Sequence, residues 1–305
     1  MPRQTVPFLL VLAIAAALSC GGTADAPKGG KVVGVTLLTR GHLFYRDLEE
    51  GLVAEAAKDG YRLVVTSADF DLGKQAAQIE DFVARKVDAI VVCPVDSKGV
   101  GPAIRRANAA GIPVFTADIA AQEGKVVCHI ASDNVAGGRL AGEYLARLLD
   151  GKGKIAIVNQ PAITSVLDRV EGFRQAVSKF PELAIVADVN GQGVRDRALE
   201  VAADVLQAHP DLDGIFGIND DSALGAMDAA RQLARDRVAI VGYDATPPAV
   251  DAIRKGSPLK ADVIQYPRKI GAATVEMIRR HFAGETLPKT LPVEVGIVDR
   301  AALPK

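Results

Sequence analysis

The stretch Asp88-Ala89-Ile90-Val91-Val92-Cys93 decides the fold class of this 305-residue chain. Its apolar residues are consecutive and do not alternate with polar ones, as in a strand that is buried on both faces. Strands of this kind belong to parallel sheets that helices cover on both sides. Similar runs alternate with longer segments of helical period that are rich in Ala, Glu, Arg and Leu. The sequence therefore predicts an α/β fold.

Ten short runs rich in β-branched residues are predicted as strands. Helix stop signals such as Asp59-Gly60 and Lys255-Gly256 end the helical segments between them. The predicted strands are 32–38, 62–67, 89–93, 113–116, 126–130, 154–159, 184–189, 214–218, 238–243 and 259–265.

The two halves of the chain repeat one another at a spacing of 121 to 126 residues. The run 88–92 has a counterpart at 213–217, and Glu50-Gly51 has one at Glu171-Gly172. Two copies of one α/β unit predict two lobes with a cleft between them. Ligands of open parallel sheets bind beyond the carboxyl ends of the strands, and clefts between domains are favoured ligand sites. We therefore expect the residues just after each strand to line the cleft.

Polar side chains occupy those strand ends. Asp118 and Asp244 each end a predicted strand, Asn219 follows another, and Gln265 follows the last one. Such groups need partners when half-buried, and a polyhydroxylated ligand offers both donors and acceptors. Arg169, early in a predicted helix, adds a planar fork of donors that balances a carboxylate. The alternative role for each acidic residue is the N-cap of the following helix.

For Asp220 and Asp221 the N-cap role is the preferred interpretation, with a helix predicted at 222–233. Gly137-Gly138 lies in a helical segment, and close helix packing explains it better than a phosphate-binding loop.

Two aromatic residues, Phe44 and Tyr45, follow the first predicted strand in a chain with only 5% aromatics. An adjacent pair at this place is suited to the apolar face of a ligand, although either ring alone also fits the packing of helix on sheet. His42 lies in the same loop and is open to three interpretations: a hydrogen bond to the ligand, an exposed residue without a role, or metal binding or catalysis.

The chain resembles the bacterial periplasmic sugar-binding proteins of the ribose-binding family over residues 32–298. Its most specific stretch is Val127-Cys128-His129-Ile130-Ala131-Ser132-Asp133-Asn134, followed by Gly137-Gly138. Ile218-Asn219-Asp220-Asp221 and Val241-Gly242-Tyr243-Asp244 also carry the resemblance.

The resemblance implies the periplasmic binding protein type I architecture, in which two Rossmann-like lobes close around one bound sugar. The hinge would have three crossings, near Ser132-Asp133, Ile264-Gln265 and Pro292-Val293. The N-terminal lobe would then comprise 31–132 plus 265–292, and the C-terminal lobe 133–264 plus 293–305.

Carried over position by position, the family's aromatic sandwich falls on Phe44 and Tyr45. Its polar ring falls on Asp118, Arg169, Asn219, Asp244 and Gln265. The chain departs from the ribose pattern at four places, because the family has Arg, Asn, Asn and an aromatic residue where this sequence has, respectively, Ile119, His42, Cys93 and Gly191-Gln192-Gly193. The ligand is therefore predicted to be a pentose, a hexose or a related polyol, and ribose itself is disfavoured.

The N-terminus has the pattern of an export signal, with Arg3, an apolar run at 8–18 and small residues before Cys20. Residues 1–19 are predicted as a signal peptide. Cys20 at the expected cleavage point resembles the lipobox of bacterial lipoproteins, although Ala17 and Leu18 are in reverse of the usual order, so plain secretion stays open. Residues 20–30 are predicted as a lipidated cysteine and flexible tether.

Composition and motifs exclude several other classes of protein. A net charge of −1 with no basic cluster argues against nucleic acid and anionic membranes as partners. The sequence has no phosphate-binding glycine loop, no nucleophile elbow and no metal-spaced histidines, so we expect no cofactor, no metal and no catalytic residue. The two other cysteines, Cys93 and Cys128, are interpreted as separately buried thiols, although one bridge is possible.

The function that these observations indicate is that of a monomeric, non-enzymatic sugar-binding protein, outside the cytoplasm, that delivers its ligand to an ABC transporter permease. The alternatives are a solute sensor that docks on a chemoreceptor and, less favoured, an exported glycosidase using Asp118 and Asp244. The effector domain of a LacI-type repressor is excluded, because the first 30 residues cannot form a helix-turn-helix.

Overall fold

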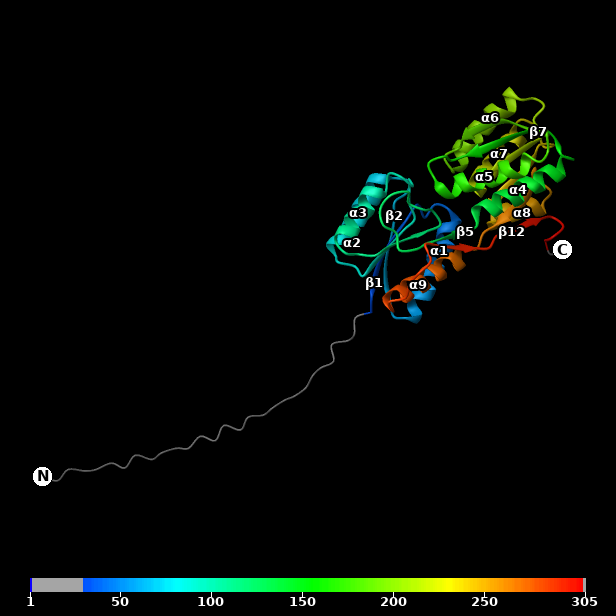
Figure 1. Ribbon diagram of the computed structural model, residues 1–305. Helices are drawn as coiled ribbons and strands as arrows, with labels where there is room; N and C mark the ends of the chain where they lie inside the picture. The colour runs from blue at the N-terminus through cyan, green and yellow to red at the C-terminus, as the bar shows by residue number, and fades with distance from the viewer. Residues whose placement is uncertain (2–29, 304–305) are drawn as a thin grey trace.

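The computed structural model describes Met1 and residues 30–303, which form two α/β lobes (Figure 1). The signal peptide predicted at 1–19 and most of the segment predicted at 20–30, Cys20 included, lie outside the described residues. No helix in the described part is long and apolar enough to cross a membrane.

The first lobe is built on a six-stranded parallel sheet in the order β11-β5-β4-β3-β1-β2. Its central strands are the most apolar, as the opening stretch predicts. The strands are β1 (Val32–Leu37), β2 (Arg62–Ser67), β3 (Ala89–Val92), β4 (Val114–Ala117), β5 (His129–Ser132) and β11 (Thr290–Val293).

Two helix pairs cover this sheet, one on each face. Ile90 and Val92 of β3 pack with α2 (Leu72–Ala84) and α3 (Gly101–Ala109). Ala89 and Val91 belong to the core formed with α1 (Leu43–Lys58) and α9 (Pro267–Phe282). Because neighbouring residues of a strand point to opposite faces, the run 89–92 must be apolar throughout. Figure 1 shows α9, from near the C-terminus, beside α1.

The second lobe repeats this arrangement in the order β12-β10-β9-β8-β6-β7. All neighbours are parallel except the edge pair of β10 and β12, which is antiparallel. The strands are β6 (Lys152–Asn159), β7 (Glu182–Asn190), β8 (Gly214–Gly217), β9 (Ala239–Asp244), β10 (Leu259–Ile264) and β12 (Gly296–Asp299). The helices are α4 (Asn134–Leu148), α5 (Thr164–Val177), α6 (Arg195–Ala208), α7 (Asp220–Gln232) and α8 (Pro247–Arg254).

The repeated Glu-Gly pairs have a structural explanation. A Cβ on Gly172 of α5 would lie 2.0 Å from the carbonyl oxygen of Val135 in α4, and one on Gly51 of α1 would lie 2.3 Å from that of Arg268 in α9. Only glycine permits these close helix contacts. Gly138 of α4 serves the same contact from the other side, since its Cβ would lie 1.9 Å from the carbonyl oxygen of Arg169. The helix-packing interpretation is confirmed for Gly138, whereas a Cβ on Gly137 would meet the ring and hydroxyl of Tyr243 in β9.

The chain passes between the two sheets three times: from β5 to α4, from β10 to α9 and from β11 to β12. The strands β11 and β12 escape prediction because they are only four residues long and half-exposed, and β11 contains Pro292, which an edge strand tolerates. β5 begins at His129, three residues later than predicted, where its pairing with β11 begins. Cys93 and Cys128 are free and buried.

Candidate ligand-binding site

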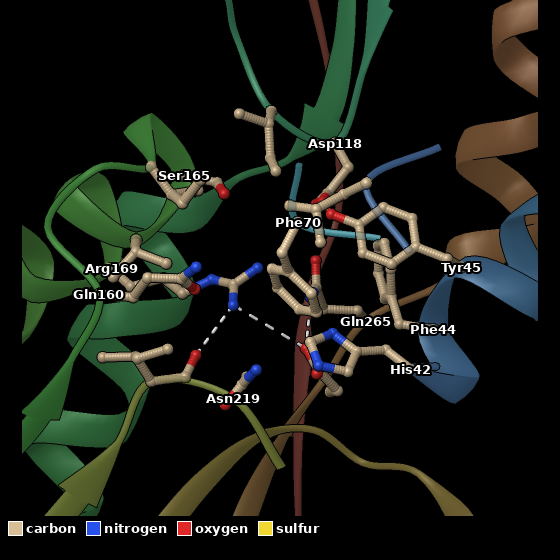
Figure 2. A pocket seen from close by; sticks show the side chains of 16 residues that line it. His42, Phe44, Tyr45, Phe70, Asp118, Gln160, Ser165, Arg169, Asn219 and Gln265 are labelled. Atoms are coloured by element: carbon tan, nitrogen blue, oxygen red, sulfur yellow. Dashed lines mark hydrogen bonds and ion pairs between the residues drawn. The ribbon is translucent and has the colours of Figure 1, made fainter. Parts of the chain in front are cut away.

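The two lobes enclose a cavity at the carboxyl ends of their strands, with about 400 Å³ of empty space, its open mouth included. His42, Phe44 and Tyr45 lie on one side of it, and Gln160, Ser165 and Arg169 on the other (Figure 2). All eight side chains named from the sequence line this one cavity: His42, Phe44, Tyr45, Asp118, Arg169, Asn219, Asp244 and Gln265.

Arg169 is held rigidly at the centre of the second lobe and is only 4% exposed. Its Nε donates to Asn134 Oδ1 at 2.9 Å, and its Nη1 donates to the carbonyl oxygen of Ile218 at 2.8 Å. The guanidinium lies over the ring of Tyr243, 3.9 Å from its centroid, and Nη1 is 3.9 Å from Asp244 Oδ1. Burial alone would lower the pKa of Arg169, but Tyr243, Asp244 and Asp118 raise it above the usual value. The site therefore keeps a fixed positive charge.

Asp118 is buried at the end of β4 and has one free oxygen. The hydroxyl of Tyr45 donates to its Oδ2 at 2.6 Å, whereas Oδ1 is buried without a partner among the described residues. Burial raises the pKa of Asp118, and the charge of Arg169 and the Tyr45 hydrogen bond oppose that rise. Tyr45 thus orients a carboxylate in addition to lining the cavity. The N-cap alternative for Asp118 does not hold, because no helix begins after it.

Asp244 ends β9 beside Gln265, whose Nε2 donates to its Oδ1 at 2.6 Å. Burial raises the pKa of Asp244 to about 8, against the effect of Arg169. Both Asp118 and Asp244 have positive φ, 66° and 119°, a strained backbone that is typical of functional sites. The N-cap of α8 is Thr246, so the capping alternative for Asp244 also fails.

Asn219 is the N-cap of α7: its Oδ1 accepts from the backbone N–H of Ser222 at 2.9 Å. Its Nδ2 donates to the carbonyl oxygen of Gly193 at 3.0 Å. The N-cap preference for Asp220 and Asp221 is therefore wrong, because α7 starts at Asp220 and the amide before it already takes the cap. Asp220 instead turns its carboxylate to the backbone N–H of Thr246, at 2.7 Å.

His42 connects the two lobes. Its Nε2 lies 3.3 Å from Asp221 Oδ2, and its ring meets Phe70 edge-on at 5.3 Å between centroids. Burial lowers the pKa of His42 more than Asp221 raises it, so the ring is neutral at pH 7. The side chain is 16% exposed, which does not fit the interpretation of an exposed residue without a role. No group of three or more His, Cys, Asp or Glu in the described part is arranged to hold a metal ion.

The cavity residues that were not predicted include Phe70, Gln160 and Ser165. Gln160 and Ser165 both come after the strand β6. They therefore agree with the expectation that residues following the strands line the cleft, although neither was named. Phe70 comes three residues after β2 and points into the site because Asp69 and Phe70 both have positive φ, 53° and 64°. The ring of Phe70 is 37% exposed. Only the strand-end position hints at it in the sequence.

Direct hydrogen bonds join the lobes at the rim of the cavity. The N–H of Ala120, in the first lobe, donates to Thr164 Oγ1 at 3.0 Å, and Thr164 Oγ1 donates to the carbonyl oxygen of Ala120 at 3.1 Å. Ser97 Oγ, also of the first lobe, accepts from the N–H of Thr164 at 3.0 Å. We call these three residues the rim latch. The cavity is thus seen in a closed form of the protein.

The family model for the periplasmic binding protein domain matches residues 33–286, which span both lobes and the cavity between them. The chain belongs to the periplasmic binding protein family. This family consists of solute-binding proteins, which agrees with the resemblance in the sequence.

Relatives of this periplasmic binding protein cover nearly its whole length. The ribose import binding protein of Salmonella typhimurium is 36% identical over 291 residues, which is 95% of this chain and 97% of that protein. An ABC transporter solute-binding protein from Mycobacterium smegmatis, solved with bound glycerol, is 33% identical with a TM-score of 0.85, covering 90% of this chain and 96% of that one. One from Actinobacillus succinogenes, solved with bound D-allose, is 27% identical with a TM-score of 0.82, covering 89% and 98%.

Proposed function

We propose that this protein is the extracytoplasmic solute-binding component of an ABC importer and that it binds one monosaccharide, a pentose or hexose, or a related polyol in the interlobe cavity. One observation carries the proposal: buried carboxylate, guanidinium and amide groups converge on one cavity, and two of their acceptor atoms, Asp118 Oδ1 and Gln265 Oε1, have no partner within residues 30–303. Unpaired buried acceptors are costly unless a ligand supplies donors.

A neutral polyhydroxylated ligand fits these groups better than a charged one. The Asp118 carboxylate accepts from hydroxyl groups, and the Arg169 fork and the amides of Asn219 and Gln265 serve as donors. The Asp244 carboxyl group, with its pKa of about 8, offers both an acceptor oxygen and an O–H donor near neutral pH. The cavity already holds both charge signs, so a ligand of either charge would leave one group uncompensated. The rings of Phe44 and Tyr45 offer an apolar wall to the C–H face of a sugar. His42 donates or accepts one hydrogen bond in neutral form.

The lobes would open and close about the three crossings. We assign 31–132 and 265–292 to one moving body, and 133–264 and 293–305 to the other. Closure brings His42 and Phe70 of the first lobe against the second lobe and completes the rim latch. The closed, loaded form then offers the permease a surface made of both lobes. A chemoreceptor that recognises the same closed surface is a second partner of this kind.

The relatives include a ribose import binding protein and solute-binding proteins solved with bound glycerol and with bound D-allose, which supports a small sugar or polyol here. Ile119 and Gly193 line or border the cavity where the ribose pattern has other residues, so the ligand is expected to differ from ribose. We propose no catalysis: Tyr45 and Gln265 already engage the two carboxylates that a glycosidase would need. We propose that the protein works as a monomer in the periplasm or on the outer face of the cell membrane, with Cys20 as its lipid anchor.

A ligand screen tests this function. The mature chain is heated with ribose, xylitol, allose, other pentoses and hexoses, and inositol, and each hit is titrated by calorimetry. Binding that is specific to one sugar or polyol, with a stabilisation that follows ligand concentration, is the expected result. If no member of the panel raises the melting temperature, the protein binds a different class of solute. Release of a chromophore from nitrophenyl glycosides would instead indicate an enzyme.

A further inference from the structure

Two carboxyl groups lie behind the candidate site and face each other in the core of the second lobe. Asp262, in the middle of β10, is fully buried, and Asp220, in the first turn of α7, is 4% exposed. The two carboxyl groups accept from the backbone N–H groups of two consecutive residues, Thr246 for Asp220 and Ala245 for Asp262, which places them close together. Two carboxylates cannot hydrogen-bond to each other unless one carries a proton. Two such groups in a buried place favour a form in which one of them carries a proton over a form with two charges.

A glycine lies opposite Asp262, and neither carboxyl group has a cationic partner within the described residues. Asp262 lies opposite Gly242 of β9 and Val298 of β12, and a Cβ on Gly242 would lie 2.4 Å from Asp262 Oδ2. Within the described residues, no Lys or Arg forms an ion pair with either carboxyl group. The oxygens Asp220 Oδ1 and Asp262 Oδ2 are buried without a hydrogen-bond partner among the described residues. Two buried negative charges in this place would be unstable.

The two carboxyl groups also hold the turn that follows the ligand-site residue Asp244. The N–H of Ala245 donates to Asp262 Oδ1 at 3.1 Å, and the N–H of Thr246 donates to Asp220 Oδ2 at 2.7 Å. Asp244 and Ala245 have φ of 119° and 54°, which costs strain energy in residues other than glycine. The pair thus supplies the external contacts that this strained turn needs.

We propose that a proton shared by Asp220 and Asp262 fixes the 244–246 turn and thereby positions Asp244 for ligand binding. This inference rests on the proposed function, because Asp244 is taken as a ligand contact. Asp220 and Asp262 are positioning residues and do not touch the ligand. Loss of the shared proton to water leaves two buried like charges beside one turn, which drives the carboxyl groups apart and releases the turn. Ligand affinity then falls with rising pH.

Other charged groups near Asp220 and Asp262 affect how readily the pair ionises. Asp221 on α7 and Asp244 on β9 are negative neighbours that disfavour ionisation of the pair, and Arg169 on α5 is close to Asp244. Burial, as the largest cause, raises the pKa of both Asp220 and Asp262. Asp244 titrates in the same direction, so the wild-type pH profile alone does not separate it from the pair.

The variant Asp262→Asn separates them. An Asn side chain accepts from the Ala245 N–H and donates to Asp220 without a titrating proton, so the turn keeps its contacts. Asp220→Asn does the same from the other side, and Asp204→Asn, at an exposed position of α6, is the matched control. Calorimetric dissociation constants for ribose, allose and xylitol are measured from about pH 6 to about pH 9.5, together with melting temperatures of the unliganded proteins.

We expect wild type and Asp204→Asn to lose about tenfold or more in affinity across this range, and Asp262→Asn to lose a clearly smaller factor, which is the part that the titration of Asp244 contributes. With the shared proton, the folded protein binds more protons than the unfolded chain does. The melting temperature of unliganded wild type should therefore fall as pH rises, and it should fall more steeply than that of Asp262→Asn. Superimposed profiles of Asp262→Asn and wild type would overturn the inference. If none of the three sugars binds wild type, the function fails, and the melting profiles still decide whether the pair shares a proton.

Discussion

Single residues at the strand ends determine the chemistry of the cavity. Asp118 shows this most clearly, because one of its oxygens is fixed by Tyr45 and the other is buried without a protein partner. The carboxylate is therefore oriented before a ligand arrives, which lowers the entropy cost of binding.

The variant Asp118→Asn should reduce affinity for the ligand found in the screen by about 10- to 100-fold, since a hydrogen bond to a charged group contributes about 1.5–3 kcal/mol. The fold should keep its melting temperature or gain slightly, because burial already raises the pKa of this carboxyl group. Calorimetry and thermal melts measure both quantities. Unchanged affinity would mean that the ligand lies elsewhere.

Phe70 is the aromatic residue that the structure adds to the site. Its ring is 37% exposed and lines the cavity on a strained turn, in contact with His42. Phe70→Ala should weaken binding by about 1–3 kcal/mol, as for a truncated aromatic contact, with little loss of stability. Phe282, at the end of α9, makes a comparable edge contact with Tyr61, and Phe282→Ala should reduce stability and leave affinity unchanged. The opposite pattern of effects would contradict this assignment.

The sequence predicts the eight strand-end residues that the cavity gathers, because parallel sheets place those positions at one edge. It does not predict Asp262, since an Asp between Ala261 and Val263 in an apolar strand has no visible partner in the sequence. The sequence does not predict the role of Phe70 either. The direction of its ring depends on the left-handed backbone of Asp69 and Phe70 and not on the pattern of the strand.

At the scale of elements, helix pairs that approach closely keep the site in place. Most strands are predicted to within a few residues from their apolar runs, whereas the two short edge strands are not, because their stability comes from pairing and not from composition. The start of α7 is also missed, because both an Asp and an Asn compete for one capping position.

Gly138→Val should separate α4 from α5, since any Cβ there would overlap the backbone of Arg169. We expect a loss of about 3 kcal/mol or more in the free energy of unfolding, together with weaker ligand binding, because Arg169 moves with its helix. Arg147→Val, at an exposed position of the same helix, should cost less than about 1 kcal/mol. Denaturant melts measure both variants, and equal losses would contradict the close-contact explanation.

At the scale of the whole molecule, the affinity depends on the balance between open and closed forms. The rim latch joins Ser97 and Ala120 of one lobe to Thr164 of the other and touches no proposed ligand contact. A ligand that binds only the closed form gains whatever free energy this latch contributes to closure.

Thr164→Val has nearly the same shape but removes the hydroxyl hydrogen bonds between the lobes. We expect affinity to fall by about 2- to 10-fold, because each such bond contributes about 0.5–1.5 kcal/mol, while the unfolding free energy changes little. Small-angle scattering should show a larger radius for the unliganded variant than for wild type. An unchanged radius and affinity would show that the latch does not affect closure.

The chain path has a consequence for synthesis. The sheet of the first lobe ends with β11, at Thr290–Val293, and α1 packs against α9, at Pro267–Phe282. A ribosome must therefore translate almost the entire message before the first lobe has all its parts. Until then the nascent chain holds an unfinished lobe, a state in which a polypeptide is still able to thread through a translocation channel.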